Sequence, residues 1–139
     1  MTRLFLCLPL LGTLLLIACK PPEPLPVGGE LNLLHKDWTL VELAGDVPPA
    51  DWDAMTLDLT NSASAGVVSS CNFGGGDYSA NSEGAFTISA IALTKRGCIS
   101  DERSDWEMRY IEALQNASRF GVDSETLYLW HESTLMRFE

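Results

Sequence analysis

The sequence is poor in positive charge and in histidine. Its 139 residues include nine Lys and Arg against 19 Asp and Glu, which gives a net charge of −10 at pH 7. An acidic surface repels phosphate backbones, so we expect no nucleic-acid partner. The two histidines, His35 and His131, have no nearby Ser or Cys in a nucleophile–base pattern, so we expect no catalytic residues and no enzyme activity. The scattered carboxylates match no calcium loop, and we expect no metal and no cofactor.

Long apolar runs are also lacking. The longest, residues 4–18, has 15 residues, short of the roughly 20 that a membrane-spanning helix requires. Arg3 precedes this run, and Leu16-Ile17-Ala18-Cys19 closes it with the pattern of a lipobox. We therefore predict a cleaved lipoprotein signal peptide over residues 1–18, rather than a transmembrane anchor, with acylation of Cys19.

The predicted cleavage defines the mature protein. Removing residues 1–18 leaves eight cations against 19 carboxylates, a net charge of −11. Among lipoproteins, Asp directly after the acylated Cys usually retains the protein at the inner membrane. Lys20 occupies that position here. We therefore expect a lipid-anchored protein on the periplasm-facing side of the outer membrane, with an envelope protein or a lipid as its further partner.

The mature chain divides into a tether and one domain. Residues 19–36 hold four prolines followed by Gly28-Gly29, which predicts an extended, semi-rigid tether outside the core. Residues 37–139 are predicted to form one α+β domain, an antiparallel and partly open β-barrel with one helix. Alternation of apolar and polar residues predicts strands over 38–43, 55–60, 67–70, 85–88, 91–94, 119–122, 126–130 and 134–138.

One segment of the domain has helical periodicity instead. Trp106, Tyr110 and Leu114 recur at i, i+4 and i+8, while Ser104 and Glu107 have the spacing of a capping box. This pattern predicts an amphipathic helix that begins at Ser104 and ends near residue 116.

Cleavage of the signal peptide and acylation of Cys19 leave Cys71 and Cys98 as a pair. An even pair in an exported protein favours a disulfide, and its loop of about 28 residues would contribute roughly 3.5 kcal/mol in the chain-entropy model. The alternative is a redox or metal pair, although the spacing is too wide for a Cys-x-x-Cys motif and no nearby His completes a zinc shell.

Two further features leave alternatives open. Gly74-Gly75-Gly76 predicts a tight bend between strands, and the weaker alternative is a phosphate-cradling loop, which lacks the usual Gly-Lys-Ser/Thr. The four tryptophans are many for this length. We expect most of them to fill the core; the alternative is that some line an apolar groove.

Several short blocks of the sequence follow one another in the order found in a known protein family. They are Trp38-Thr39-Leu40, the run from Ser70-Cys71-Asn72 through the glycines to Tyr78, the block Ile91-Ala92-Leu93-Thr94-Lys95-Arg96-Gly97-Cys98, Glu107, and Leu127-Tyr128-Leu129. Over residues 37–138 the chain resembles the META/HslJ-like family of bacterial envelope proteins.

The resemblance implies a small β-rich barrel with one helix and a link to envelope stress and antibiotic tolerance. No catalytic residues are carried over from it. Asn72, Gly74, Tyr78 and Thr94 fall on signature positions, and we expect them to have structural roles, since Asn and Thr side chains routinely bind nearby backbone.

The function expected from the sequence is that of a non-enzymatic outer-membrane lipoprotein. It would act by binding, as an envelope-stress or assembly accessory. The alternative is a carrier or pilot-like protein that holds lipid or an apolar peptide in a groove of the β-barrel. In that case Tyr128 and Trp130, on the strand face opposite Leu127 and Leu129, would line the groove.

Overall fold

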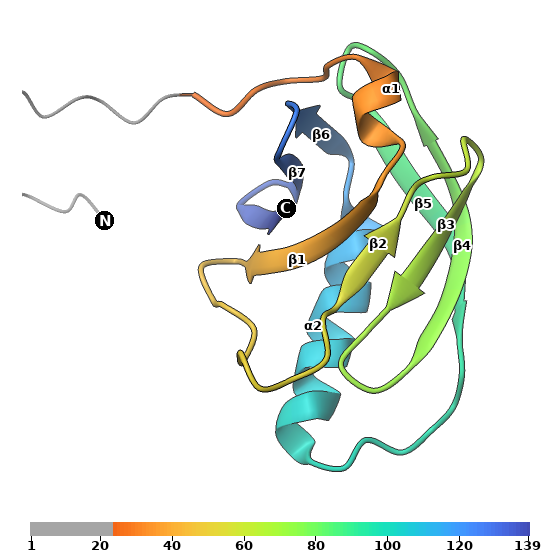
Figure 1. Ribbon diagram of the computed structural model, residues 1–139, viewed down its shortest axis with the longest axis vertical. Coiled ribbons are helices and arrows are strands. Elements are labelled where there is room, and N and C mark those ends of the chain that lie inside the picture. Colours follow the sequence, from red (N-terminus) through yellow and green to blue (C-terminus); the bar gives the residue numbers. More distant parts are fainter. Residues whose placement is uncertain (1–23) are drawn as a thin grey trace, which may run out of the picture.

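The computed structural model describes residues 24–139 of the chain (Figure 1). The predicted signal peptide, Cys19 and the first residues of the tether lie outside the described residues. Within the described range, no helix has the length and apolar character required to cross a bilayer.

The described chain forms one antiparallel sheet with a long helix packed against it. The sheet order is β5-β4-β3-β2-β1-β8-β7-β6, and every neighbouring pair of strands is antiparallel. The elements are α1 (Leu31–Leu34), β1 (Asp37–Leu43), β2 (Thr56–Asp58), β3 (Ser64–Val68), β4 (Phe73–Ala80), β5 (Phe86–Leu93), α2 (Asp101–Asn116), β6 (Arg119–Val122), β7 (Leu127–His131) and β8 (Thr134–Phe138). The predicted α+β class and antiparallel, partly open barrel are confirmed.

The sheet curls until its two outer strands meet at one end. The Phe86 N–H donates to the Ser118 carbonyl at 3.1 Å, and the Phe120 N–H donates to the Gly84 carbonyl at 2.9 Å. Beyond this contact β5 has no strand partner on its outer side among the described residues, and α2 packs against β5 and β7. The result is a half-barrel closed at one end by strand pairing, with α2 running beside the open part (Figure 1).

The core fills the concave side of the sheet. Alternate residues of the strands point inward, as the period-two pattern predicted, and α2 adds its own apolar face. Trp38 is 1% exposed and Tyr110 is 0% exposed. The largest fully buried side chains are Trp38, Tyr110, Phe86, Phe120, Phe138, Leu34, Leu43, Met55, Leu57, Leu59, Leu114 and Leu127. The interior is therefore a packed core.

Two of the four tryptophans belong to this core. Trp38 donates its indole N–H to the Leu34 carbonyl at 2.9 Å, and Trp106 is 7% exposed. Trp52 is half-buried and packs edge-on against Trp106, with ring centroids 6.5 Å apart. Trp130 is half-buried on the outer face of β7.

The predicted helix is confirmed, but it begins one turn earlier than its capping box indicated. Ser100 is the N-cap, with extended backbone, and its Oγ accepts the Arg103 N–H at 3.2 Å. Ser104 already lies inside the helix and donates its hydroxyl to the Ser100 carbonyl at 3.2 Å. Asp101 and Glu102 occupy the first turn, where the helix dipole favours negative charge. The capping box at Ser104 is therefore wrong, and Glu107 is free for other contacts.

The bend predicted at the three glycines is also wrong. Gly74, Gly75 and Gly76 lie inside β4, where all three pair with β3 and the first two also pair with β5. A Cβ atom on Gly74 would collide with the Ala92 carbonyl, and one on Gly75 with the Ala65 carbonyl. Glycine is required here because the neighbouring backbones approach too closely for any side chain.

Strand β5 was predicted as two strands because a bulge interrupts it. The two strands predicted over 85–88 and 91–94 are one continuous strand, β5. Ala90 adopts a φ of 53° within it, opposite a register shift between Gly75 and Asp77. This bulge interrupts the alternation that sequence reasoning took for a break between strands.

The end of the predicted tether is folded onto the domain. The Gly28 N–H donates to the Phe120 carbonyl at 2.8 Å, and the Val122 N–H donates to the Gly28 carbonyl at 3.0 Å. Leu34, in α1, is fully buried. The structure thus differs from the predicted tether over residues 28–36, because this segment covers the β6 edge and places one leucine in the core.

Burial of Tyr110 predicts a loss of stability at alkaline pH. Desolvation, aided by the negative charge of Asp37, raises the pKa of Tyr110 far above its ordinary value of 10.0. The pKa of Tyr110 is higher in the folded than in the unfolded chain. The contribution of Tyr110 to the free energy of unfolding is therefore fully present below about pH 10. As the pH rises above this value, the free energy of unfolding falls by up to about 1.4 kcal/mol per pH unit. We expect Tyr110→Phe to flatten this alkaline slope, measured by urea unfolding between pH 8 and 11.

The same substitution removes a hydrogen bond from the Tyr110 hydroxyl to the Thr56 carbonyl at 3.1 Å. At pH 7 it should therefore cost about 1 kcal/mol. Tyr128→Phe, on the outer face of β7, is the matched control and should keep the wild-type slope. Equal alkaline slopes in wild type and Tyr110→Phe would contradict the prediction.

Candidate functional site

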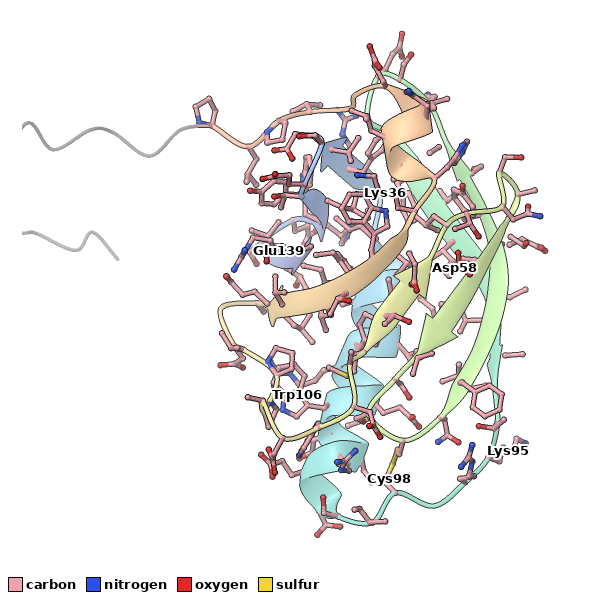
Figure 2. All side chains as sticks on the ribbon, viewed as in Figure 1. Lys36, Asp58, Lys95, Cys98, Trp106 and Glu139 are labelled. Atoms are coloured by element: carbon pink, nitrogen blue, oxygen red, sulfur yellow. A yellow bond between two sulfur atoms is a disulfide. The ribbon has the colours of Figure 1, made fainter. Side chains whose placement is uncertain are left out.

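The two cysteines lie together at one end of the molecule. Cys71 is in the loop between β3 and β4, and Cys98 is in the loop that leads into α2. They are 27 positions apart in sequence, and their Cα atoms are 5.4 Å apart, with the sulfur atoms in a disulfide. Figure 2 shows the yellow sulfur of Cys98 beside the start of α2. The two cysteines are therefore close enough to form the disulfide that the sequence predicted.

Asn72 is the centre of a polar network beside the disulfide. Its side-chain amide is 5% exposed and uses both donors and both acceptor positions. Nδ2 donates to the Arg96 carbonyl at 3.1 Å and to Glu107 Oε1 at 2.9 Å. Oδ1 accepts the Thr94 hydroxyl at 2.7 Å and the Arg96 N–H at 2.9 Å. One side chain thus joins the β3–β4 loop, the end of β5 and α2.

Glu107 is the residue of α2 that takes part in this network. Its Oε2 accepts the Ser69 hydroxyl and is 3.3 Å from Sγ of Cys71. Ser69 Oγ also accepts the Asn72 N–H at 3.0 Å. The loop before β4 is therefore tied to the second turn of α2 through a carboxylate.

Arg103 adds a second tie one helical turn earlier. Its Nη1 donates to the Ser70 carbonyl at 2.6 Å, and its guanidinium stacks 4.4 Å from the Trp52 ring centroid. The Ser70 hydroxyl donates to the Arg103 carbonyl at 2.5 Å. Ser69, Ser70 and Asn72 are all at most 5% exposed, whereas Arg103 and Glu107 are half-buried, so these hydrogen bonds are partly shielded from water.

The four signature positions, Asn72, Gly74, Tyr78 and Thr94, have different roles in the structure. Thr94 joins the network through Asn72. Gly74 serves the close strand packing in β4. Tyr78 belongs to the core, 7% exposed and stacked on Phe86 at 6.0 Å between ring centroids. Burial, with the charge of Asp58 nearby, raises the pKa of Tyr78.

Sequence reasoning missed most partners of Asn72. Glu107 was matched to the family pattern but interpreted as part of a capping box. Ser69 and Arg103 carried no signal of their own. The main clue available was the position of Asn72 next to a paired cysteine, with Thr94 near the second cysteine.

A groove opens beside the network. It lies between the face of α2 that carries Met108 and the segment from Leu93 to Cys98, and its volume is about 660 Å³. Glu107 and Cys98 both contribute to its wall. Met108 is 62% exposed, and Ile99, next to Cys98, is 88% exposed. The groove is thus lined by apolar, acidic and basic side chains, Arg96 among them, at the same end as the disulfide.

The structure places Tyr128 and Trp130, the residues expected to line a groove, on the outer face of β7. Leu127 and Leu129 are fully buried in the core, and Tyr128 and Trp130 are half-buried on the outer face of β7. Four hollows on the described surface are lined by other residues.

The hydrogen bonds of the network connect three segments of the fold. Among the described residues, every buried side-chain nitrogen and oxygen has a hydrogen-bond partner. The hydrogen bonds of the network tie the β3–β4 loop, the segment after β5 and α2 to one another. One group of potential metal ligands does occur in this part of the chain: the sulfurs of Cys71 and Cys98 and a carboxylate oxygen of Glu107 lie within 4.8 Å of one another.

These features define a class: a small antiparallel half-barrel with one long helix, joined at the helix start by a cysteine pair. The META domain family model matches residues 31–139. The chain therefore belongs to the META domain family, as the sequence resemblance indicated.

Solved structures share this fold. The chain is similar to the protein from Burkholderia xenovorans solved by NMR, with 22% identity, a TM-score of 0.68 and coverage of 88% of this chain and 94% of that one. It is also similar to a DUF4847 family protein from Bacteroides vulgatus ATCC 8482, with 18% identity, a TM-score of 0.51 and coverage of 75% and 91%. No curated protein matches the sequence significantly. At these identities the likeness concerns the fold.

Proposed function

We propose that this META domain protein is a non-enzymatic lipoprotein of the outer membrane that acts by binding, as an envelope-stress or assembly accessory. Cys19 would carry the acyl chains that hold it at the membrane. The observation that supports a binding role best is the closed network at Asn72. Its polar groups hydrogen-bond to one another, while the apolar side chains of Met108 and Ile99 nearby remain exposed.

The groove beside α2 supplies the binding surface in this proposal. Met108 and Ile99 are strongly exposed apolar side chains, and the disulfide and Asn72 network hold the two walls of the groove together. A rigid surface binds at a lower entropic cost than one that must become ordered. The partner would be an envelope protein that contributes an apolar segment.

The alternative is a carrier that binds lipid or an apolar peptide within the barrel. The filled core and the positions of Tyr128 and Trp130 give it no support. Its distinguishing feature is the mass of what is bound, because a lipid is far smaller than a protein partner.

Site-specific photo-cross-linking in intact cells tests the proposal. A photoreactive amino acid at Met108 should give a discrete protein-sized product, whereas the same group at Glu83, in the exposed turn between β4 and β5 at the other end of the fold (Figure 1), should not. The Cys19→Ser variant should lose both the acyl mass and the product, because the protein no longer reaches its membrane. A lipid-sized adduct at Met108 would support the carrier instead, and equal products at both positions would contradict a defined surface.

A further inference from the structure

The carboxylate of Glu107 faces a sulfur atom without a proton between them. Oε2 of Glu107 lies 3.3 Å from Sγ of Cys71, and a disulfide sulfur has no hydrogen to donate. None of the ion pairs among residues 24–139 includes Glu107. Arg103, one turn earlier on α2, directs its guanidinium to the Ser70 carbonyl and the Trp52 ring instead. The carboxylate and the cysteine pair thus form a cluster of electron-rich atoms that has no cation of its own.

We propose that the dithiol form of the protein binds one Zn²⁺ through Cys71, Cys98 and Glu107. Thiolate and carboxylate are both ligands that Zn²⁺ accepts. Zn–S and Zn–O bonds of about 2.3 and 2.0 Å place neighbouring tetrahedral ligands roughly 3.5 Å apart. The three ligand atoms lie within 4.8 Å of one another, and the Cys71–Glu107 distance is already 3.3 Å.

The third ligand is held in place by hydrogen bonds from side chains other than the cysteines. Asn72 donates to Oε1 of Glu107 at 2.9 Å, and the Ser69 hydroxyl contacts Oε2. Asn72 is itself fixed by Thr94 and by the backbone of Arg96. Such outer hydrogen bonds orient metal ligands and raise metal affinity. Reduction of the disulfide would leave this arrangement of the carboxylate in place.

Solvent and a metal ion can reach the cluster from the groove. Cys98 and Glu107 both line it, and both cysteines and Glu107 are partly exposed. The three protein ligands would leave a fourth position for water, as in zinc sites that are open to solvent. An entry path and a fixed outer shell are two of the features that a metal site requires.

The disulfide and the metal would be alternative states of one site. An external dithiol of the thioredoxin type would transfer two electrons and two protons to the Cys71–Cys98 bond and become a disulfide itself. Binding of Zn²⁺ would then displace the two thiol protons into solvent. A disulfide of an external protein would accept the two electrons and two solvent protons to become a dithiol, while the two thiolates return to the Cys71–Cys98 bond and the ion is released. This inference does not depend on the proposed binding partner.

The test measures zinc binding to the full chain carrying Cys7→Ser and Cys19→Ser, in mild detergent, so that Cys71 and Cys98 are the remaining cysteines. After reduction by a phosphine, we expect one Zn²⁺ per chain, measured by competition with a chromogenic chelator. The oxidised chain should retain none. Glu107→Gln should weaken binding at least about tenfold, a change typical of altered metal shells. Glu112→Gln, which changes another carboxylate that lines the groove, should bind as the parent chain does.

Circular dichroism follows folding in the same samples. Should the reduced chain unfold without metal, the proposal requires Zn²⁺ to restore the fold, and to do so less well in Glu107→Gln. The proposal is overturned if the reduced, folded chain binds less than one Zn²⁺, if a reduced, unfolded chain is not restored by Zn²⁺, or if Glu107→Gln and the parent chain bind equally. In the first two cases the cysteine pair would be a structural cross-link alone, and in the third Glu107 would not be a ligand.

Discussion

Replacing Asn72 by Ala should destabilise the domain by about 3–5 kcal/mol, because its buried side chain makes four hydrogen bonds and each contributes about 1 kcal/mol. Four groups would lose their partner: the Thr94 hydroxyl, the N–H and carbonyl of Arg96, and Oε1 of Glu107. The loss should appear as a melting temperature lowered by roughly 10–20 °C for a domain of this size. Urea unfolding at pH 7, followed by tryptophan fluorescence, measures the free energy directly.

Two variants separate the hydrogen bonds of Asn72 from its volume. Asn72→Asp keeps the shape but places an oxygen where Nδ2 donates to Glu107, so it should be at least as destabilising as Ala. Asn116→Ala, at the exposed end of α2, is the control and should change stability by less than about 1 kcal/mol. A stable Asn72→Asp variant would show that the network does not hold the fold.

The second large effect concerns the cysteine pair. The Cys71→Ser/Cys98→Ser double variant should lose about 3.5 kcal/mol, because the cross-link no longer restricts the unfolded chain. Its loop joins the start of β4 to the start of α2. Both cysteines are replaced so that no unpaired thiol remains, as it would after a single substitution.

Reductant provides the matched comparison for this prediction. In the presence of EDTA, which removes any zinc, a phosphine should lower the melting temperature of the wild type toward that of the double variant. The double variant itself should not respond. Equal melting temperatures for oxidised wild type and the double variant would rule out a stabilising disulfide at this position.

The effects of Asn72 and of the cysteine pair should not be additive. Asn72 follows Cys71 directly, and both join the same loop to the residues before α2. Residues that share a network or a backbone segment usually couple by 0.5–3 kcal/mol. In the reduced chain the hydrogen bonds of Asn72 are the main remaining tie at this end of the molecule, together with Arg103.

Much of the fold followed from local patterns in the sequence. The alternation in β1, β7 and β8 indicated which residues face the core, and Trp106, Tyr110 and Leu114 indicated the buried face of α2. These periods of 2 and 3.6 residues arise within a single segment of chain. The spacing of the cysteines likewise required no knowledge of the partners around them.

The errors fall where a neighbour in space decided the outcome. The three glycines were taken for a bend, yet they lie in a central strand because the backbones on both sides approach closely. Ser104 was taken for an N-cap, although Ser100 could begin the helix one turn earlier. Leu34 was placed in a tether, but the core had a position for it beside Trp38.

The sequence by itself determined the antiparallel α+β class, the inward faces of its strands and helix, the cysteine pair and membership of the META family. The tertiary structure alone decided the site. Asn72 meets Arg96 and Glu107 from 24 and 35 positions away, and the carboxylate reaches the disulfide only because α2 returns beside the β3–β4 loop. Periodicity reports the face on which a residue lies, whereas hydrogen-bond partners and metal ligands are set by distances between segments that are remote in sequence.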